Sequence, residues 1–158
     1  FDEAEAAVQR GLAIIDRFKL EELKFQADYL MGQIAFERGE YAQSADHFNQ
    51  ALERIGRSVL VGSDTNLLLP ALYGLLARSY VYAGNLDAAE SALEQGFEQD
   101  PSEPALWLSK ARFQQHSGLN DLARASVNYA LAIWKDADED YRWARAARRL
   151  LAELNSTG

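Results

Sequence analysis

A repeated order of small and large residues is the feature that most restricts the fold of this chain. Four segments share the order small, large, small, large at the same relative positions. Taken position by position, the residues are Ala4, Ser44, Ala89 and Ala123; Val8, Phe48, Leu93 and Val127; Gly11, Ala51, Gly96 and Ala130; and Leu12, Leu52, Phe97 and Leu131. Small residues at fixed positions let neighbouring helices approach closely, and large residues fill the space that remains. Four matches in register therefore predict a repeated helical unit.

The unit is clearest between Tyr73 and Pro101, where two short amphipathic helices are predicted. Apolar residues recur at helical spacing in both halves of this stretch, and Gly84 marks the bend between them. Gly39 and Gly118 mark similar bends, 45 residues before and 34 residues after Gly84. A helical hairpin of this size cannot bury both apolar stripes alone, so it requires copies of itself on either side. We expect an all-α chain, because no segment alternates apolar and polar residues over the length of a strand.

The repeated unit also has a set of aromatic, small and proline residues at fixed places. They are Tyr73, Leu76, Ala77, Tyr80, Ala89, Leu93, Gly96 and Pro101, then Trp107, Ala111, Gly118, Ala123, Ala130 and Leu131 in the next unit, and Met31, Gly32, Ala35, Phe36, Gly39, Tyr41, Phe48, Ala51 and Leu52 in the one before. This pattern resembles the tetratricopeptide repeat (TPR) family from Phe1 to about Trp134. Ser44 and Lys110 depart from it, where the family has alanine and leucine. The resemblance implies a right-handed α-solenoid of antiparallel helix pairs, with about eight helices.

The resemblance divides a single domain, residues 1–158, into consecutive parts. They are the second helix of a truncated repeat (1–16), a repeat (20–57), an insert (57–66), two further repeats (67–101 and 102–134) and a C-terminal capping helix (139–154). Ser102 is expected to cap the helix that follows it. Because the array begins with a second helix, we expect a piece of a longer protein, with a native start or proteolysis as alternatives. The stretch Trp134–Asp138 also resembles the end of TPR arrays in bacterial multidomain signalling proteins, which implies a bacterial fragment.

Composition and charge narrow the classes of partner. The formal net charge of −8 argues against a nucleic-acid backbone as the main partner, because such binders need a basic surface. No run of apolar residues approaches the roughly 18 that a membrane span needs. The absence of cysteine excludes disulfides, thiolate nucleophiles and cysteine zinc sites. It suits the cytoplasm, which is slightly favoured, and the periplasm too, so the compartment stays open.

No group of residues has the spacing of a catalytic, cofactor or metal site. His47 and His116 have no second metal ligand three or four residues away on the same helix face. Asp136, Asp138 and Asp140 alternate as in a calcium loop, but the required glycine and closing glutamate are absent. These aspartates are better explained by the positive end of the last helix. We therefore expect no enzyme, no cofactor and no metal.

The arginines of the last predicted helix have two interpretations. Arg142, Arg145, Arg148 and Arg149 follow one another within eight residues. Such a group can bind phosphate or an acidic peptide. More often it is a solvated face near the negative end of a helix, and this is the interpretation that we favour from the sequence.

In TPR proteins the first helices of successive units line a concave surface. The resemblance implies that a peptide or a partner helix contacts their outward residues, which are Gln26, Tyr29, Gln33, Phe36, Glu37, Arg78, Val81, Tyr82, Leu108, Arg112, Gln115 and His116. Two arginines on this face of an acidic chain favour an acidic segment or chain end as the ligand. The predicted function is thus a scaffold for protein–protein interaction. The alternative is self-association through apolar surface on the first helix and the insert, in which case the chain would form a homo-oligomer.

One TPR partner is not expected. Co-chaperones of this family hold the acidic tail of heat-shock proteins with a clamp of two lysines, two asparagines and an arginine. Tyr29, Gln33, Leu75, Ala105 and Ser109 stand at those positions in this chain. None of them matches the clamp, so a different ligand is predicted.

Overall fold

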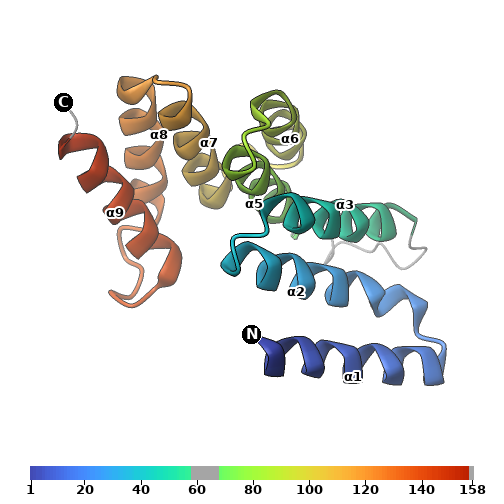
Figure 1. Cartoon of the computed structure of the whole chain (residues 1–158). Coiled ribbons are helices and arrows are strands. Elements are labelled where there is room, and N and C mark those ends of the chain that lie inside the picture. Colours follow the sequence, from blue (N-terminus) through green and yellow to red (C-terminus); the bar gives the residue numbers. More distant parts are fainter. Residues whose placement is uncertain (58–67, 157–158) are drawn as a thin grey trace.

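The computed structural model describes residues 1–57 and 68–156, and within these ranges it is helical without any strand (Figure 1). The eight α-helices of the described residues are α1 (Asp2–Phe18), α2 (Lys24–Glu37), α3 (Tyr41–Arg57), α5 (Leu69–Tyr82), α6 (Leu86–Gln99), α7 (Pro104–His116), α8 (Asn120–Ile133) and α9 (Arg142–Ser156). A short 3₁₀-helix, η1 (Glu21–Leu23), precedes α2. The all-α expectation is confirmed. The predicted insert at 57–66 lies, beyond its first residue, outside the described residues.

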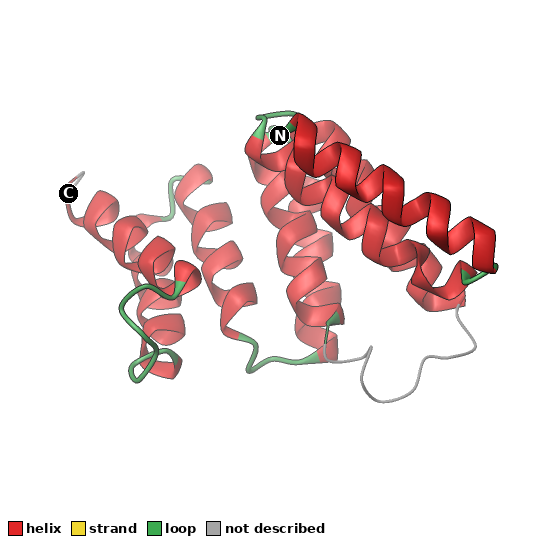
Figure 2. Ribbon diagram, turned by 90° about the horizontal axis from the view of Figure 1, so that it is seen from below, coloured by secondary structure: helices red, strands yellow, loops and turns green. Residues whose placement is uncertain are grey.

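The helices pack as consecutive pairs that stack into a solenoid (Figure 1, Figure 2). α2 packs on α3, α5 on α6 and α7 on α8, while contacts of α5 with α3 and with α7 join the pairs. α1 packs on α2 at one end, and α9 packs on α8 at the other. Because every pair is flanked by another helix, the apolar stripes that one hairpin cannot bury become a shared core.

The three turns within the pairs have the same backbone conformation. Gly39, Gly84 and Gly118 have φ angles of 80°, 81° and 75°, in the left-handed region that glycine adopts without strain. The Asn85 N–H donates to the Tyr80 carbonyl over 2.9 Å and closes the end of α5. The Asn85 side chain accepts a backbone N–H from the first turn of α6. One short segment therefore ends one helix and begins the next.

Small residues of the repeat let the helices approach closely. A Cβ atom built on Gly96 would lie 2.9 Å from Cβ of Tyr73 and 2.5 Å from Cδ2 of Leu106. A Cβ atom on Gly32 would lie 2.6 Å from the ring of Phe48. Leu106 and Phe48 have no exposed surface. The order of small and large residues in the sequence therefore corresponds to close helix contacts filled by large side chains.

Ser44, one of the two departures from the repeat pattern, takes part in a buried polar contact. Its Oγ lies 2.8 Å from the Gly32 carbonyl oxygen and 2.9 Å from Oγ of Ser79. Oγ of Ser79 lies 3.0 Å from the Leu75 carbonyl oxygen, and both serines are fully buried. Two hydroxyl donors thus find acceptors inside the core and join α2, α3 and α5.

Two helix starts differ from the sequence expectation. Glu103 caps α7 in place of Ser102, because Oε1 of Glu103 accepts the Ala105 N–H over 3.0 Å. The N–H and the hydroxyl of Ser102 instead donate to the carboxylate of Asp100. α9 begins at Arg142 rather than at residue 139, so the acidic residues before it lie in the loop instead of the first turn.

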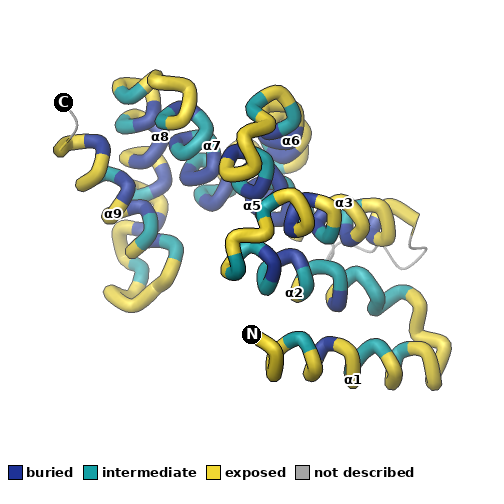
Figure 3. Tube along the Cα trace, viewed as in Figure 1, coloured by how far each residue is buried: buried dark blue, intermediate teal, exposed yellow. Residues whose placement is uncertain are grey.

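α1 is packed on one face only. Val8 is buried, and Arg38, which follows the last residue of α2, forms an ion pair with Glu5 over 2.9 Å. Much of the rest of α1 is exposed (Figure 3), including 57% of the surface of Ile14 and 62% of that of Phe18. One face of this helix therefore packs on α2 through apolar and charged residues, while apolar side chains on the rest of its surface are exposed to solvent.

Candidate functional site

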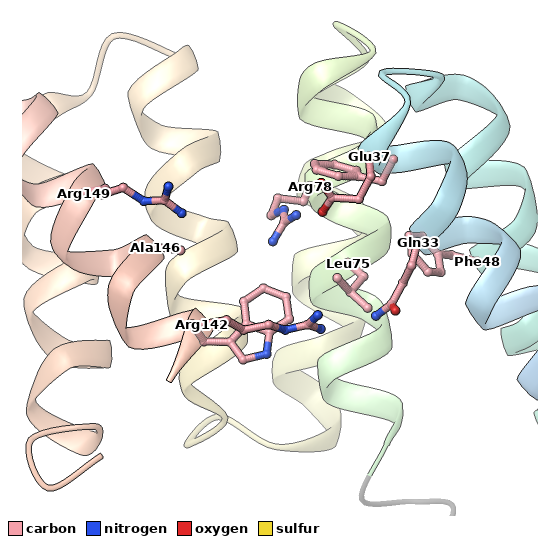
Figure 4. A pocket seen from close by; sticks show the side chains of 10 residues that line it. Gln33, Glu37, Phe48, Leu75, Arg78, Arg142, Ala146 and Arg149 are labelled. Carbon is pink, nitrogen blue, oxygen red and sulfur yellow. The ribbon is translucent and has the colours of Figure 1, made fainter. Parts of the chain in front are cut away.

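A cleft of about 240 Å³ opens between α9 on one side and α2, α3 and α5 on the other (Figure 4). The residues that line it are Gln33, Phe36, Glu37, Phe48, Leu75, Arg78, Arg142, Trp143, Ala146 and Arg149. Arg78 faces this space from one wall, and Arg142 and Arg149 face it from the other (Figure 4). The cleft is therefore formed by segments that are far apart in the sequence.

Arg78 lies between two aromatic rings. Its guanidinium carbon is 4.3 Å from the ring centre of Phe36 and 5.3 Å from that of Trp143. Burial lowers the pKa of the Arg78 guanidinium below its ordinary value, with nearby arginines acting in the same direction and Glu37 against it. Among residues 1–57 and 68–156, no ion pair involves Arg78. The aromatic rings, rather than a carboxylate, hold this cation in place.

α9 presents a row of residues to the cleft at helical spacing. Arg142, Ala146 and Arg149 are separated by four and three residues, so they lie on one face of the helix. The face that includes Leu150 and Leu154 is fully buried, and α9 packs against α8. The apolar stripe of α9 thus fixes which of its arginines reach the cleft.

The cleft brings together part of the set predicted from the sequence. The predicted residues that line it are Gln33, Phe36, Glu37 and Arg78. Tyr29 is linked to this group, because Nε2 of Gln33 donates to its hydroxyl over 2.7 Å. Gln26 is exposed in the first turn of α2 and does not line the cleft.

Aromatic rings continue from the cleft along the ends of the first helices. Tyr82 lies with its ring centre 5.5 Å from that of Phe36 and 5.1 Å from that of Tyr41. The ring of His116 is 5.4 Å from Tyr82 on the other side. Two predicted residues, Tyr82 and His116, therefore belong to a row of rings that joins three helix pairs beside the cleft.

Arg112 of α7 forms an ion pair with a residue of α9. Its Nη1 donates to Oε2 of Glu153 over 2.6 Å and to Oε1 of Gln115 over 3.0 Å. The hydrogen bond from Arg112 lowers the pKa of the Glu153 carboxyl below its ordinary value. Arg112 and Gln115 thus help to place α9 relative to α7, and the cleft wall depends on that position.

Val81 and Leu108 differ from the sequence expectation, because each is buried with 2% of its surface exposed. Leu108 belongs to the core beneath α9, so neither side chain is available to a ligand. Conversely, the repeat pattern did not assign Arg142, Trp143 or Arg149 to the groove. Their helical spacing was visible in the sequence, but the sequence does not show which surface α9 faces.

The described residues contain no cluster of three or more histidine, aspartate and glutamate side chains suited to a metal ion. None of the helices that the structure describes is long and apolar enough to cross a membrane. The chemistry that the cleft does offer is cationic and aromatic. Guanidinium groups bind carboxylates and phosphates, and aromatic rings provide apolar contact area beside them.

Two models of the tetratricopeptide repeat match this chain, over residues 23–102 and 75–141. No curated protein matches it. Among solved structures, it is similar to a chain of the APC/C hetero-tetramer Cut9–Hcn1, with 22% identity and a TM-score of 0.62, over 81% of this chain and 23% of that chain. This chain thus spans about a quarter of the length of that relative.

A second similar structure is the first TPR of Spaghetti (RPAP3), solved bound to the HSP90 peptide SRMEEVD. It shares 14% identity with a TM-score of 0.59, and the match covers 86% of this chain and 94% of that chain. At these identities both structures support the fold alone, which is the expected α-solenoid. The first family match spans half of the sequence and includes two complete helix pairs. This chain therefore belongs to the tetratricopeptide repeat family.

Proposed function

We propose that this chain is a non-enzymatic interaction module, part of a larger protein, that binds a peptide or a helix of a partner protein in the cleft between α2, α5 and α9. The observation that supports this most directly is the cleft itself, in which Arg78 lies close to two aromatic rings and forms no ion pair with a described residue. TPR repeats generally mediate protein–protein interaction. The second similar structure holds a peptide, which supports the same kind of ligand in this chain.

The same cleft favours a ligand that differs from that of the similar structure. The peptide bound there includes two glutamates and an aspartate. In this chain the five positions of the heat-shock clamp have no basic residue, and three of them, Leu75, Ala105 and Ser109, are buried. An acidic ligand would therefore meet arginines at other places, and the acidic tail of heat-shock proteins is not favoured.

Selection from a displayed library of random peptides tests this function. The immobilised chain should enrich peptides that also bind it in solution, as measured by fluorescence anisotropy. In the double variant Arg78→Gln/Tyr82→Ala their affinity should fall about tenfold, since a cation and an aromatic anchor are lost from one face. The matched control is Arg10→Gln/Tyr129→Ala, which makes the same changes at exposed positions outside the cleft. If both variants bound the peptides with equal affinity, binding in the cleft would be refuted. If no peptide were enriched, peptide binding itself would be refuted.

Self-association is a second candidate, favoured by the exposed apolar surface of α1. Ile14 and Phe18 lie one helical turn apart, and more than half of each side chain is exposed. A copy of this chain could cover this surface, as in symmetric dimers of helical proteins. Light scattering over a dilution series distinguishes the candidates: a dimer that Ile14→Glu/Phe18→Glu dissociates supports self-association, and a monomer at all concentrations excludes it.

A further inference from the structure

We propose that the cleft is a carboxylate-binding site in which Arg78 of α5 acts together with Arg142 and Arg149 of α9, so that its ligand is an acidic peptide segment. This inference rests on the proposed function and adds the chemical class of the ligand. It also gives α9 a second role, because the helix that covers the end of the array becomes one wall of the binding site.

The surroundings of Arg78 support a carboxylate ligand. Phe36 and Trp143 lie against its guanidinium group at 4.3 Å and 5.3 Å. Aromatic rings attract the cation by its charge and offer no strong hydrogen-bond acceptor to its five N–H donors. Within residues 1–57 and 68–156, none of those donors forms a hydrogen bond or an ion pair with another side chain. A carboxylate can accept two of them side by side.

The opposite wall adds cations at a defined spacing. Arg142 and Arg149 are seven residues apart on α9, which places their Cα atoms about 10 Å apart along the helix axis. Arg142 also lies close to Trp143, with its guanidinium carbon 4.8 Å from the ring centre. One aromatic ring thus lies beside arginines from both walls. A single carboxylate cannot contact the whole row, so the site suits several acidic residues in succession.

The charge of the lining is opposite to that of the chain. Three arginines and one glutamate, Glu37, line the cleft. The chain as a whole has a formal net charge of −8. An acidic segment would be repelled by most of the surface and attracted into this cleft, since charge complementarity determines which surface a charged ligand approaches. Positive charge retained in one cleft of an acidic protein therefore indicates the charge of the ligand.

Fluorescence anisotropy with a labelled, C-terminally amidated hexaglutamate peptide tests the inference. Six extended residues span about 20 Å, which is enough to contact both walls. The peptide should bind the chain, and Arg142→Gln/Arg149→Gln should weaken binding about tenfold or more, as should Arg78→Gln, because each loses charge-assisted hydrogen bonds. The control is Arg145→Gln/Arg148→Gln, which removes the same charge from exposed positions of the same helix outside the lining. It should bind hexaglutamate nearly as well as the unmodified chain.

Several results would overturn the inference. Equal loss in the control variant would mean that binding reflects the general charge of α9. Equal binding of hexaglutamine would mean that carboxylates are not recognised. If hexaglutamate with a free C-terminus bound much more tightly than the amidated peptide, the ligand would be the end of a chain and not an internal acidic segment. If equimolar inorganic phosphate displaced the peptide completely, the cleft would be a phosphate site. If library peptides bind the cleft while hexaglutamate does not, the carboxylate assignment fails and the proposed function stands; if neither binds, both fail.

Discussion

Replacement of Gly96 by alanine tests whether close helix approach determines the small residues of the repeat. In an exposed helix this change should raise the free energy of unfolding by about 1 kcal/mol, because alanine has the higher helix propensity. At Gly96 the new Cβ would lie 2.9 Å from Cβ of Tyr73, an atom fixed to the backbone of α5, and 2.5 Å from the fully buried Leu106. Overpacking of this kind costs about 1–3 kcal/mol. The expected net effect is a destabilisation of up to about 2 kcal/mol.

Gly11 provides a matched control, because it occupies the same position of the repeat in α1. A Cβ atom built there would meet nothing within 4 Å. Gly11→Ala should therefore stabilise the chain by up to about 1 kcal/mol. The helix-propensity gain is common to both variants, so the difference between them isolates the overpacking cost of about 1–3 kcal/mol.

Urea unfolding followed by circular dichroism at 222 nm measures both variants. The midpoint should move to lower urea for Gly96→Ala and to higher urea for Gly11→Ala, with unchanged m-values. If Gly96→Ala stabilises the chain as much as Gly11→Ala does, steric contact at this position does not limit residue size. Close helix approach would then not be the cause of the repeat pattern.

Three further changes have defined outcomes. Asn85→Ala removes the side-chain cap of α6 and should lower the free energy of unfolding by about 1 kcal/mol; an unchanged urea midpoint would contradict this. Ser44→Ala removes the buried hydroxyl that contacts Ser79 and should cost about 1 kcal/mol by the same measurement, whereas a stabilised variant would show that the polar contact is not favourable. Glu153→Gln should cost less than about 1 kcal/mol at pH 7, since the carboxylate is half exposed. Arg112 depresses the pKa of Glu153 in the folded state, so the stabilisation is present above the ordinary glutamate pKa of about 4.3 and is lost as pH falls through the folded-state value. The difference in thermal stability between variant and parent should therefore be largest at pH 7 and shrink as the pH is lowered through the acid range; a constant difference would refute the ion pair as the cause.

The helices could be predicted from the sequence because their signals are local. Apolar spacing gives a helix, and glycine at a fixed offset gives the turn; α6 (Leu86–Gln99) lies between Gly84 and Pro101, where the second helix of the hairpin is predicted. The cap of α7 was misassigned, since Ser102 and Glu103 both have suitable side chains. Glu103 caps the helix because the hydroxyl of Ser102 donates to the carboxylate of Asp100 instead. Such a choice depends on atoms outside the helix itself.

The candidate site could be predicted only in part, because it depends on how distant segments are placed. Arg78 and Phe36 follow from their positions on first helices. Val81 and Leu108 have similar positions but are covered by neighbouring helices, which a pattern within one helix cannot show. Arg142 belongs to the site only because the apolar stripe of α9 packs on α8 and turns its row of arginines toward α5. Helix orientation relative to a distant wall is a tertiary property.

The buried serine pair has a consequence for the positions of the helices that line the cleft. Apolar surfaces can shift against one another at small cost, because one dispersion contact replaces another. Oγ of Ser44 and Oγ of Ser79 lie 2.9 Å apart, and each hydroxyl also has a carbonyl acceptor, that of Gly32 for Ser44 and that of Leu75 for Ser79. When one hydroxyl donates to the other, the bond depends on the relative position of α3 and α5, because a hydrogen bond weakens steeply with distance and misalignment. The two serines thus provide a directional contact between successive helix pairs, α2 with α3 and α5 with α6. The relative position of Phe36 and Arg78, on which a ligand in the cleft would depend, is therefore influenced by two serines that are themselves fully buried.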